Sequence, residues 1–170
     1  MKNPMALLAG LLLIMTPGCS YIKVADYSGF CNIGEDGMLQ GWEYELSPTE
    51  GDSTLDLSGT YDVVIAVRYT NSCPSQSVIF NIEEFSLAQE RPDSVTITIP
   101  LFDGDGEPVG RSRFGIIETS DTIRRDFRVP DGYSLSLSTP LPSSATVGIK
   151  AVGMVLVDRS QKKPLFKIKL

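Results

Sequence analysis

The reactive side chains of this chain of 170 residues include 21 acidic residues and three cysteines but no histidine. Without histidine, neither a Ser-His-Asp triad, nor a Cys-His nucleophile, nor a Cys/His zinc site can be assembled. Acidic side chains form the catalytic pair of glycoside hydrolases, but no spacing in the sequence selects two of them. The sequence therefore nominates no catalytic residue, metal ligand or cofactor, and we expect a protein that is not an enzyme.

One acidic segment has the composition of a calcium loop. Asp103, Asp105 and Glu107 alternate with glycines, which would place three carboxylates close together. An EF-hand loop starting at Asp103 would need glycine at Pro108 and glutamate at Phe114, and neither position fits. Asp and Gly also tolerate the positive φ angles of tight turns. We therefore predict a hairpin turn here rather than a metal site.

Cys19 is the residue best placed for a covalent modification. It follows the apolar run Met5–Met15, which is shorter than the about 20 residues of a membrane-spanning helix but has the length of a signal peptide core. Gly18 supplies the small residue that a signal peptidase needs, so the segment resembles the lipobox of bacterial lipoproteins. We predict that residues 1–18 are a lipoprotein signal peptide and that Cys19 carries lipid. The alternative is an ordinary signal peptide with Cys19 as a thiol.

The residues after Cys19 predict where the anchor lies. More than one acyl chain gives stable anchoring, because each buried methylene adds about 0.8 kcal/mol. Ser20 stands where Asp would favour retention in the inner membrane, so it resembles an outer-membrane address. The absence of an acidic run next to it favours the periplasmic side over the cell surface. We expect residues 19–38 to be the lipidated amino terminus and a tether.

The other two cysteines are Cys31 and Cys73. An oxidising periplasm permits a disulfide bond between them. Closing so long a loop would stabilise the fold by on the order of 3–4 kcal/mol if the geometry allows it. Two buried thiols are the alternative, and the sequence does not decide between the two.

Composition and charge restrict the class of protein. Hydrophobic residues make up 42% and charged residues 21% of the chain, as in ordinary globular domains, and the length suits one domain. The net charge of -6 argues against a nucleic-acid partner, because phosphate contacts need basic surfaces. We therefore expect a single globular domain over residues 39–170.

Short strand patterns recur between turn signals along this domain. They combine β-branched residues with either alternation or a continuous apolar run, and no convincing amphipathic helix interrupts them. The predicted strands are Tyr61–Thr70, Ser77–Ile82, Ser94–Leu101, Tyr133–Ser138, Gly148–Val157 and Leu165–Lys169. This pattern predicts an all-β fold, an antiparallel β-sandwich of jelly-roll type.

Two further patterns allow a binding or modification site. Trp42 and four tyrosines could form a platform that stacks on sugar rings, which would make the protein a glycan-binding module, although aromatics more often serve packing. Those tyrosines are Tyr44, Tyr61, Tyr69 and Tyr133. Ser53, Ser94 and Thr122 each follow an aspartate, as in the O-glycosylation acceptor of some bacterial exported proteins. Chance and turn chemistry explain these Asp-Ser and Asp-Thr pairs equally well.

The order of several features resembles the gliding-motility lipoproteins of the GldH family. These features follow one another from the amino terminus to the last predicted strand. They are Cys19, Trp42, a strand ending in Val67-Arg68-Tyr69, Thr96–Asp103 followed by Gly106 and Gly110, Phe127–Tyr133, and Gly148–Met154. The resemblance implies a non-catalytic accessory lipoprotein of gliding motility or of the associated secretion machinery. Its partners would be other envelope proteins.

Overall fold

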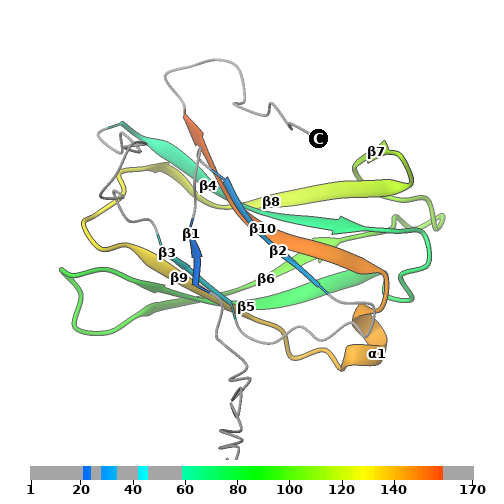
Figure 1. Cartoon of the computed structure of the whole chain (residues 1–170), viewed down its shortest axis with the longest axis horizontal. Helices are drawn as coiled ribbons and strands as arrows, with labels where there is room; N and C mark the ends of the chain where they lie inside the picture. Colours follow the sequence, from blue (N-terminus) through cyan, green and yellow to red (C-terminus); the bar gives the residue numbers. More distant parts are fainter. Residues whose placement is uncertain (1–20, 24–27, 34–41, 46–58, 159–170) are drawn as a thin grey trace, which may run out of the picture.

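Two β-sheets packed face to face form the body of the protein, as seen in a computed structural model that describes residues 21–23, 28–33, 42–45 and 59–158 (Figure 1). Each sheet has five strands within these ranges. The first runs in the order β1 (Tyr21–Lys23), β3 (Trp42–Glu45), β9 (Ser134–Ser138), β5 (Ser77–Phe85) and β6 (Asp93–Pro100). The second runs in the order β2 (Ser28–Asn32), β10 (Ile149–Asp158), β4 (Tyr61–Tyr69), β8 (Ile116–Phe127) and β7 (Arg111–Arg113).

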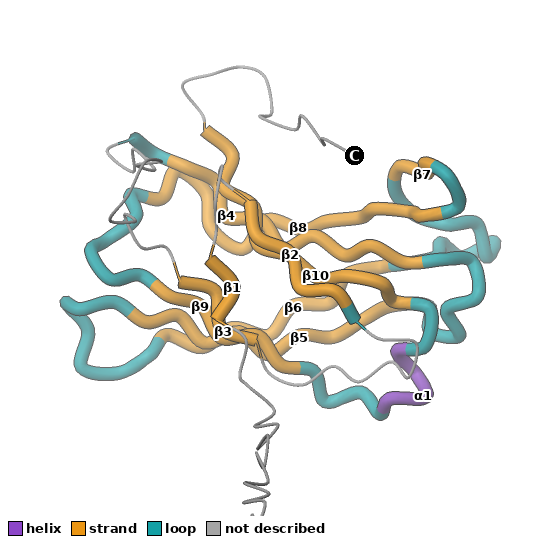
Figure 2. Tube along the Cα trace, viewed as in Figure 1, coloured by secondary structure: helices purple, strands orange, loops and turns teal. Residues whose placement is uncertain are grey.

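Neighbouring strands are antiparallel, except that β1 runs parallel to β3. The prediction of an all-β antiparallel sandwich is therefore confirmed. A short helix, α1 (Ser143–Thr146), lies at one end of the layers (Figure 2). No helix in the described ranges is long and apolar enough to cross a membrane.

The centre of the second sheet consists of β4 and β10, whose sequences are mainly apolar, with long uninterrupted apolar runs. Both strands are buried along nearly their whole length, on both faces. Strands covered on both faces lose the alternation of polar and apolar residues. In the first sheet, β5 and β9 keep that alternation because only one face of each strand points into the core.

Buried tyrosines connect separate parts of the core through hydrogen bonds. Tyr44 in β3 donates its hydroxyl proton to the carbonyl oxygen of Val152 in β10, at 2.9 Å, and so links the two sheets. The hydroxyl of Tyr69 contacts the carbonyl oxygens of Leu101 and of Val109, the latter at 2.8 Å. These tyrosines are fully buried, and burial raises the pKa of each above its usual value, most strongly for Tyr44. They therefore act as hydrogen-bond donors inside the sandwich.

The predicted tether contains strands of the sandwich. Strands β1 and β2 both lie within residues 19–38, and each is paired with a strand from the later part of the chain. The boundary predicted at residue 39 is therefore wrong: the domain takes in residues from Tyr21 onward. Short strands of three and five residues carry too little pattern to be recognised in isolation.

The turn predicted at Asp103 is confirmed. One carboxylate oxygen of Asp103 accepts hydrogen bonds from the backbone N–H groups of Asp105 and Glu107, both at 2.9 Å. Gly106 adopts a positive φ of 82° and closes the turn on the carbonyl oxygen of Asp103. The strand predicted at Leu165–Lys169 lies outside the described residues.

Candidate functional site

Glu84 is a carboxylate in the interior of the sandwich. In β5 every second side chain points into the core, and Val78, Phe80 and Ile82 occupy the first three inward positions. Glu84 takes the fourth and is 3% exposed. A buried carboxylate is stable only when hydrogen-bond donors or positive charges surround it, so its neighbours decide what it can do.

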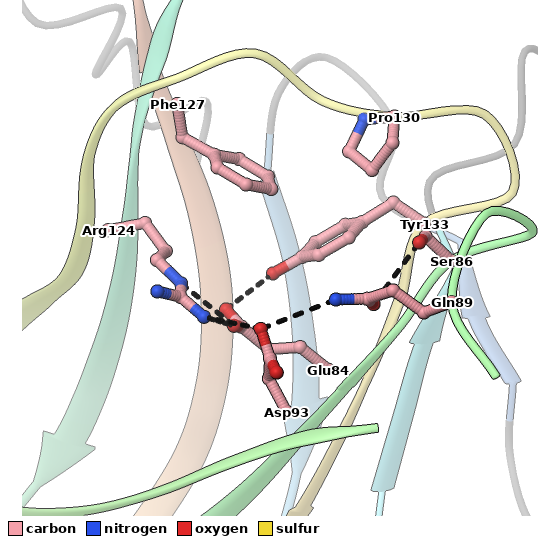
Figure 3. A pocket seen from close by; sticks show the side chains of 8 residues that line it. All are labelled: Glu84, Ser86, Gln89, Asp93, Arg124, Phe127, Pro130 and Tyr133. Atoms are coloured by element: carbon pink, nitrogen blue, oxygen red, sulfur yellow. Dashed lines mark hydrogen bonds and ion pairs between the residues drawn. The ribbon is translucent and has the colours of Figure 1, made fainter. Parts of the chain in front are cut away.

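Arg124 supplies the positive charge from the opposite sheet (Figure 3). Its Nε and Nη2 atoms donate to the same oxygen of Glu84, Oε2, at 2.8 and 2.5 Å. The hydroxyl of Tyr133 donates to the other oxygen, Oε1, at 2.8 Å. Both oxygens of the buried carboxylate are therefore satisfied, one by a residue of β8 and the other by the residue that precedes β9.

Asp93 extends this network towards solvent. It lies directly opposite Glu84 in the register of β5 and β6, so two carboxylates face each other across the strand pair. Such like-charge pairs are unfavourable unless a cation lies between them. Nη2 of Arg124 also donates to Asp93 at 3.2 Å, and Gln89 donates to the same oxygen of Asp93 at 3.3 Å. We call Glu84, Asp93, Arg124 and Tyr133 the Glu84 cluster.

Electrostatics within the Glu84 cluster favour a fixed arrangement. The hydrogen bond to Glu84 raises the pKa of Arg124 further above its usual range, so the guanidinium stays charged. Burial, followed by the charge of Glu84, raises the pKa of Tyr133 far above its ordinary value. Tyr133 therefore stays protonated and works as a donor. Neither group is prepared for proton transfer near neutral pH.

A shallow depression of about 110 Å³ opens beside the cluster. Its walls combine the cluster with the side chains of Ser86, Gln89, Phe127 and Pro130 (Figure 3). The ring of Phe127 lies against that of Tyr133, with the ring centroids 5.2 Å apart. Among the described residues, every buried side-chain nitrogen and oxygen atom has a hydrogen-bond partner. The arrangement therefore supports a structural role: it links the two sheets and the turn before β9 by charge and hydrogen bonds.

The predicted disulfide bond is not formed in the structure, where Cys31 and Cys73 are separate thiols. Cys31 lies opposite Val152 of β10, whereas Cys73 packs against Gly148, just before the same strand. Four residues of extended chain separate these two positions by on the order of 13 Å. A disulfide needs Cα atoms within about 7 Å of each other. The structure therefore has two thiols, as the alternative held, but only Cys73 is buried and Cys31 is half-buried.

The two thiols differ in their surroundings, which leads to a testable difference in reactivity. Cys73 is 6% exposed and burial raises its pKa, whereas Cys31 is half-buried. Because the thiolate is the reactive form, we expect iodoacetamide to alkylate Cys31 at least about tenfold faster than Cys73 in the native protein. Peptide mass spectrometry after timed labelling measures both rates. A disulfide would instead protect both residues until a reductant is added, and equal rates would also contradict the prediction.

The sites predicted for modification fall in different environments. Cys19 and Ser53 lie outside the described residues. Ser94 is exposed on β6, and Thr122 is half-buried on β8, opposite Val64. The backbone N–H of Thr122 donates to Oδ1 of Asp121 at 2.7 Å, so the aspartate of this Asp-Thr pair forms a local hydrogen bond with the backbone.

The tyrosines that could have formed a sugar-stacking platform do not lie on the surface. Tyr44, Tyr61, Tyr69 and Tyr133 are each at most 3% exposed and belong to the core. Their rings belong to the hydrophobic core, as the favoured interpretation of these aromatics, packing, predicts. The side chain of Trp42 lies outside the described part of the structure.

The Glu84 cluster was not predicted from the sequence, although part of the signal was present. The inward alternation of Val78, Phe80 and Ile82 continues to Glu84, and this indicates a buried carboxylate. Nothing in the local sequence pairs Glu84 with Arg124, because the two residues are 40 positions apart and on different sheets.

No protein-family model and no curated protein matches this chain. The resemblance to the GldH family therefore remains a prediction from the order of sequence features.

Proposed function

We propose that this chain is a non-catalytic lipoprotein, anchored to the outer membrane through Cys19, that serves as an accessory component of gliding motility or of the associated secretion machinery. The sequence features that support the anchor are the apolar run Met5–Met15 and the pair Gly18-Cys19. The order of features shared with the GldH family supports the accessory role.

One structural observation carries the proposal further than the sequence does. Strand β1 begins at Tyr21, two residues after Cys19, and pairs in register with β3. Two residues of chain reach at most about 7 Å. If Cys19 carries acyl chains, the sandwich is held directly at the membrane surface, without the long tether expected from the sequence.

This geometry suits a component that must present a fixed face to other envelope proteins. A short connection restricts the domain to a thin layer above the membrane and limits its rotation. Confinement of this kind raises the effective concentration of the domain towards partners in the same layer. Within the domain, the hydrogen bond of Tyr44 to Val152 and the ion pair of Arg124 with Glu84 hold the two sheets together.

The experiment that tests the role uses the full chain in its native envelope. Cells are treated with a chemical crosslinker, the chain is purified under denaturing conditions, and the attached proteins are identified by mass spectrometry. We expect components of the motility or secretion machinery, and we expect the Cys19→Ser variant to lose them because the domain leaves the membrane layer. Recovery of no such component from the native chain would contradict the proposed role.

A further inference from the structure

The strand directions show from which end of the sandwich the chain approaches β1. Strand β1 is parallel to β3, and β3 is antiparallel to β9. The amino-terminal end of β1 therefore points to the end of the first sheet where β9 finishes. In this register Tyr21 pairs with Glu43 and Glu43 with Ser136, so Tyr21 lies two strand spacings, about 10 Å, from Ser136. Two residues of chain place Cys19 within about 7 Å of Tyr21.

Two connections between strands form the surface at this end. Segment 70–76 joins β4 to β5, and segment 139–148, which contains α1, joins β9 to β10. The hydroxyl of Ser75 donates to the carbonyl oxygen of Ala145 at 2.6 Å, and a backbone hydrogen bond also joins the two segments. They therefore form one continuous surface, which we call the α1 end; the helix marks its place in Figure 2.

The α1 end carries no charged side chain. Charged residues make up 21% of the whole chain, yet residues 69–82 and 133–149 contain none. The exposed side chains of this surface include the amide of Asn71, the hydroxyl of Ser144 and the apolar group of Val147, which is 39% exposed. A charged side chain loses its hydration when it approaches a bilayer, whereas hydroxyl, amide and apolar groups can lie at the level of the lipid head groups.

The described connections that carry charge lie elsewhere. Each of the two described connections at the opposite end, 86–92 and 128–133, contains an acidic and a basic residue. The acidic turn at Asp103 follows β6, which is four strand spacings from β1, on the order of 19 Å. The uncharged pair of connections is therefore at the end from which the chain approaches β1, and is closer to β1 in the order of strands than the acidic turn.

We propose that the α1 end lies against the lipid head groups of the membrane that holds Cys19. The inference rests on the proposed lipid anchor and adds to it the orientation of the domain. The partner is a bilayer because the anchor brings one within a short length of chain of this end, and an uncharged surface can meet it without desolvating a charge. The depression beside the Glu84 cluster then faces away from the membrane, because Glu84 pairs with Asp93 near the other end of β5.

Photo-crosslinking in the native envelope tests this contact with the full chain. A benzophenone-bearing amino acid replaces Ser144 or, in a separate variant, Asn71, both of which are exposed. After irradiation the chain is purified, and mass spectrometry identifies the attached molecules. We expect adducts of bilayer lipids at both positions. The matched control is Arg125, which is exposed on β8 eight positions after Ile117, the partner of Tyr69, and so lies about 26 Å from the α1 end.

The acyl chains on Cys19 are measured in the same samples, so that the anchor and the orientation are tested separately. Lipid adducts at Ser144 and Asn71, with none at Arg125 above an unirradiated sample, support the inference. If Cys19 is acylated but both positions give no lipid adduct, give no more than Arg125, or crosslink to another protein only, the orientation is overturned and the anchor stands. If Cys19 is unmodified, the proposed function and this inference fail together.

Discussion

The Arg124→Met variant is expected to lose about 3 kcal/mol of unfolding free energy. The substitution leaves the carboxylate of Glu84, which is 3% exposed, with only the hydroxyl of Tyr133 as a donor. Removing one partner of a buried ion pair costs about 3–5 kcal/mol, and the lower end applies because the Arg124 side chain is 41% exposed. Methionine keeps the apolar stem of the side chain, so the loss reports the charge. Chemical denaturation at neutral pH gives the free energy.

Two companion variants separate the ion pair from other effects. Arg125→Met removes the neighbouring exposed arginine and should change stability by less than about 0.5 kcal/mol. Adding Glu84→Leu to Arg124→Met removes the orphaned carboxylate and should restore most of the lost stability. If Arg124→Met were as stable as the native chain, Glu84 would not depend on its ion pair.

The Gly110→Ala variant is expected to lose about 2–4 kcal/mol of unfolding free energy, because two independent constraints act at this position. Gly110 has a φ of 125°, which side chains rarely adopt, and an added Cβ would lie 2.2 Å from the carbonyl oxygen of Glu118. That contact is with backbone, so strand β8 or the segment before β7 must move. The side chain of Glu118 also forms an ion pair with Arg68, with 2.7 Å between Nε of Arg68 and Oε2 of Glu118.

Gly106→Ala is the matched control for this loss. Gly106 also has a positive φ, 82°, but an added Cβ there meets nothing within 4 Å. We expect Gly106→Ala to lower the unfolding free energy by about 1 kcal/mol, which is the conformational strain alone. Thermal and chemical denaturation of both variants measure the difference. Equal losses would mean that the close approach to Glu118 contributes nothing.

The regular strands of the domain are predictable from the sequence because their patterns are local. Tyr61–Thr70 and Gly148–Val157 are apolar runs, and Ser94–Leu101 alternates, so β4, β10 and β6 appear within a residue or two of their predicted bounds. Strand β8, the longest at twelve residues, has no such pattern. Its charged and hydroxyl side chains are balanced by partners on other strands, such as Glu84 for Arg124 and Arg68 for Glu118, which local sequence does not reveal.

The candidate site and the thiols depend on long-range geometry. Glu84 is visible as an inward position of β5, but the identity of its partner follows from the way β8 passes over β6 and β5 in the opposite sheet. Likewise, the cysteine count allowed a bond between Cys31 and Cys73, and only the register of β2 on β10 separates them. Pairing across the sandwich is a property of the whole fold.

The proposed role depends on one covalent event, the acylation of residue 19 of the chain. Trypsin cleaves after Lys23, so the mature lipoprotein should release the short amino-terminal lipopeptide Cys19–Lys23. Mass spectrometry of this peptide, from protein isolated with the outer membrane, measures both the cleavage site and the acyl chains. We expect a peptide that begins at Cys19 and carries acyl chains on it. A peptide that begins elsewhere, or one with an unmodified Cys19, would contradict the account.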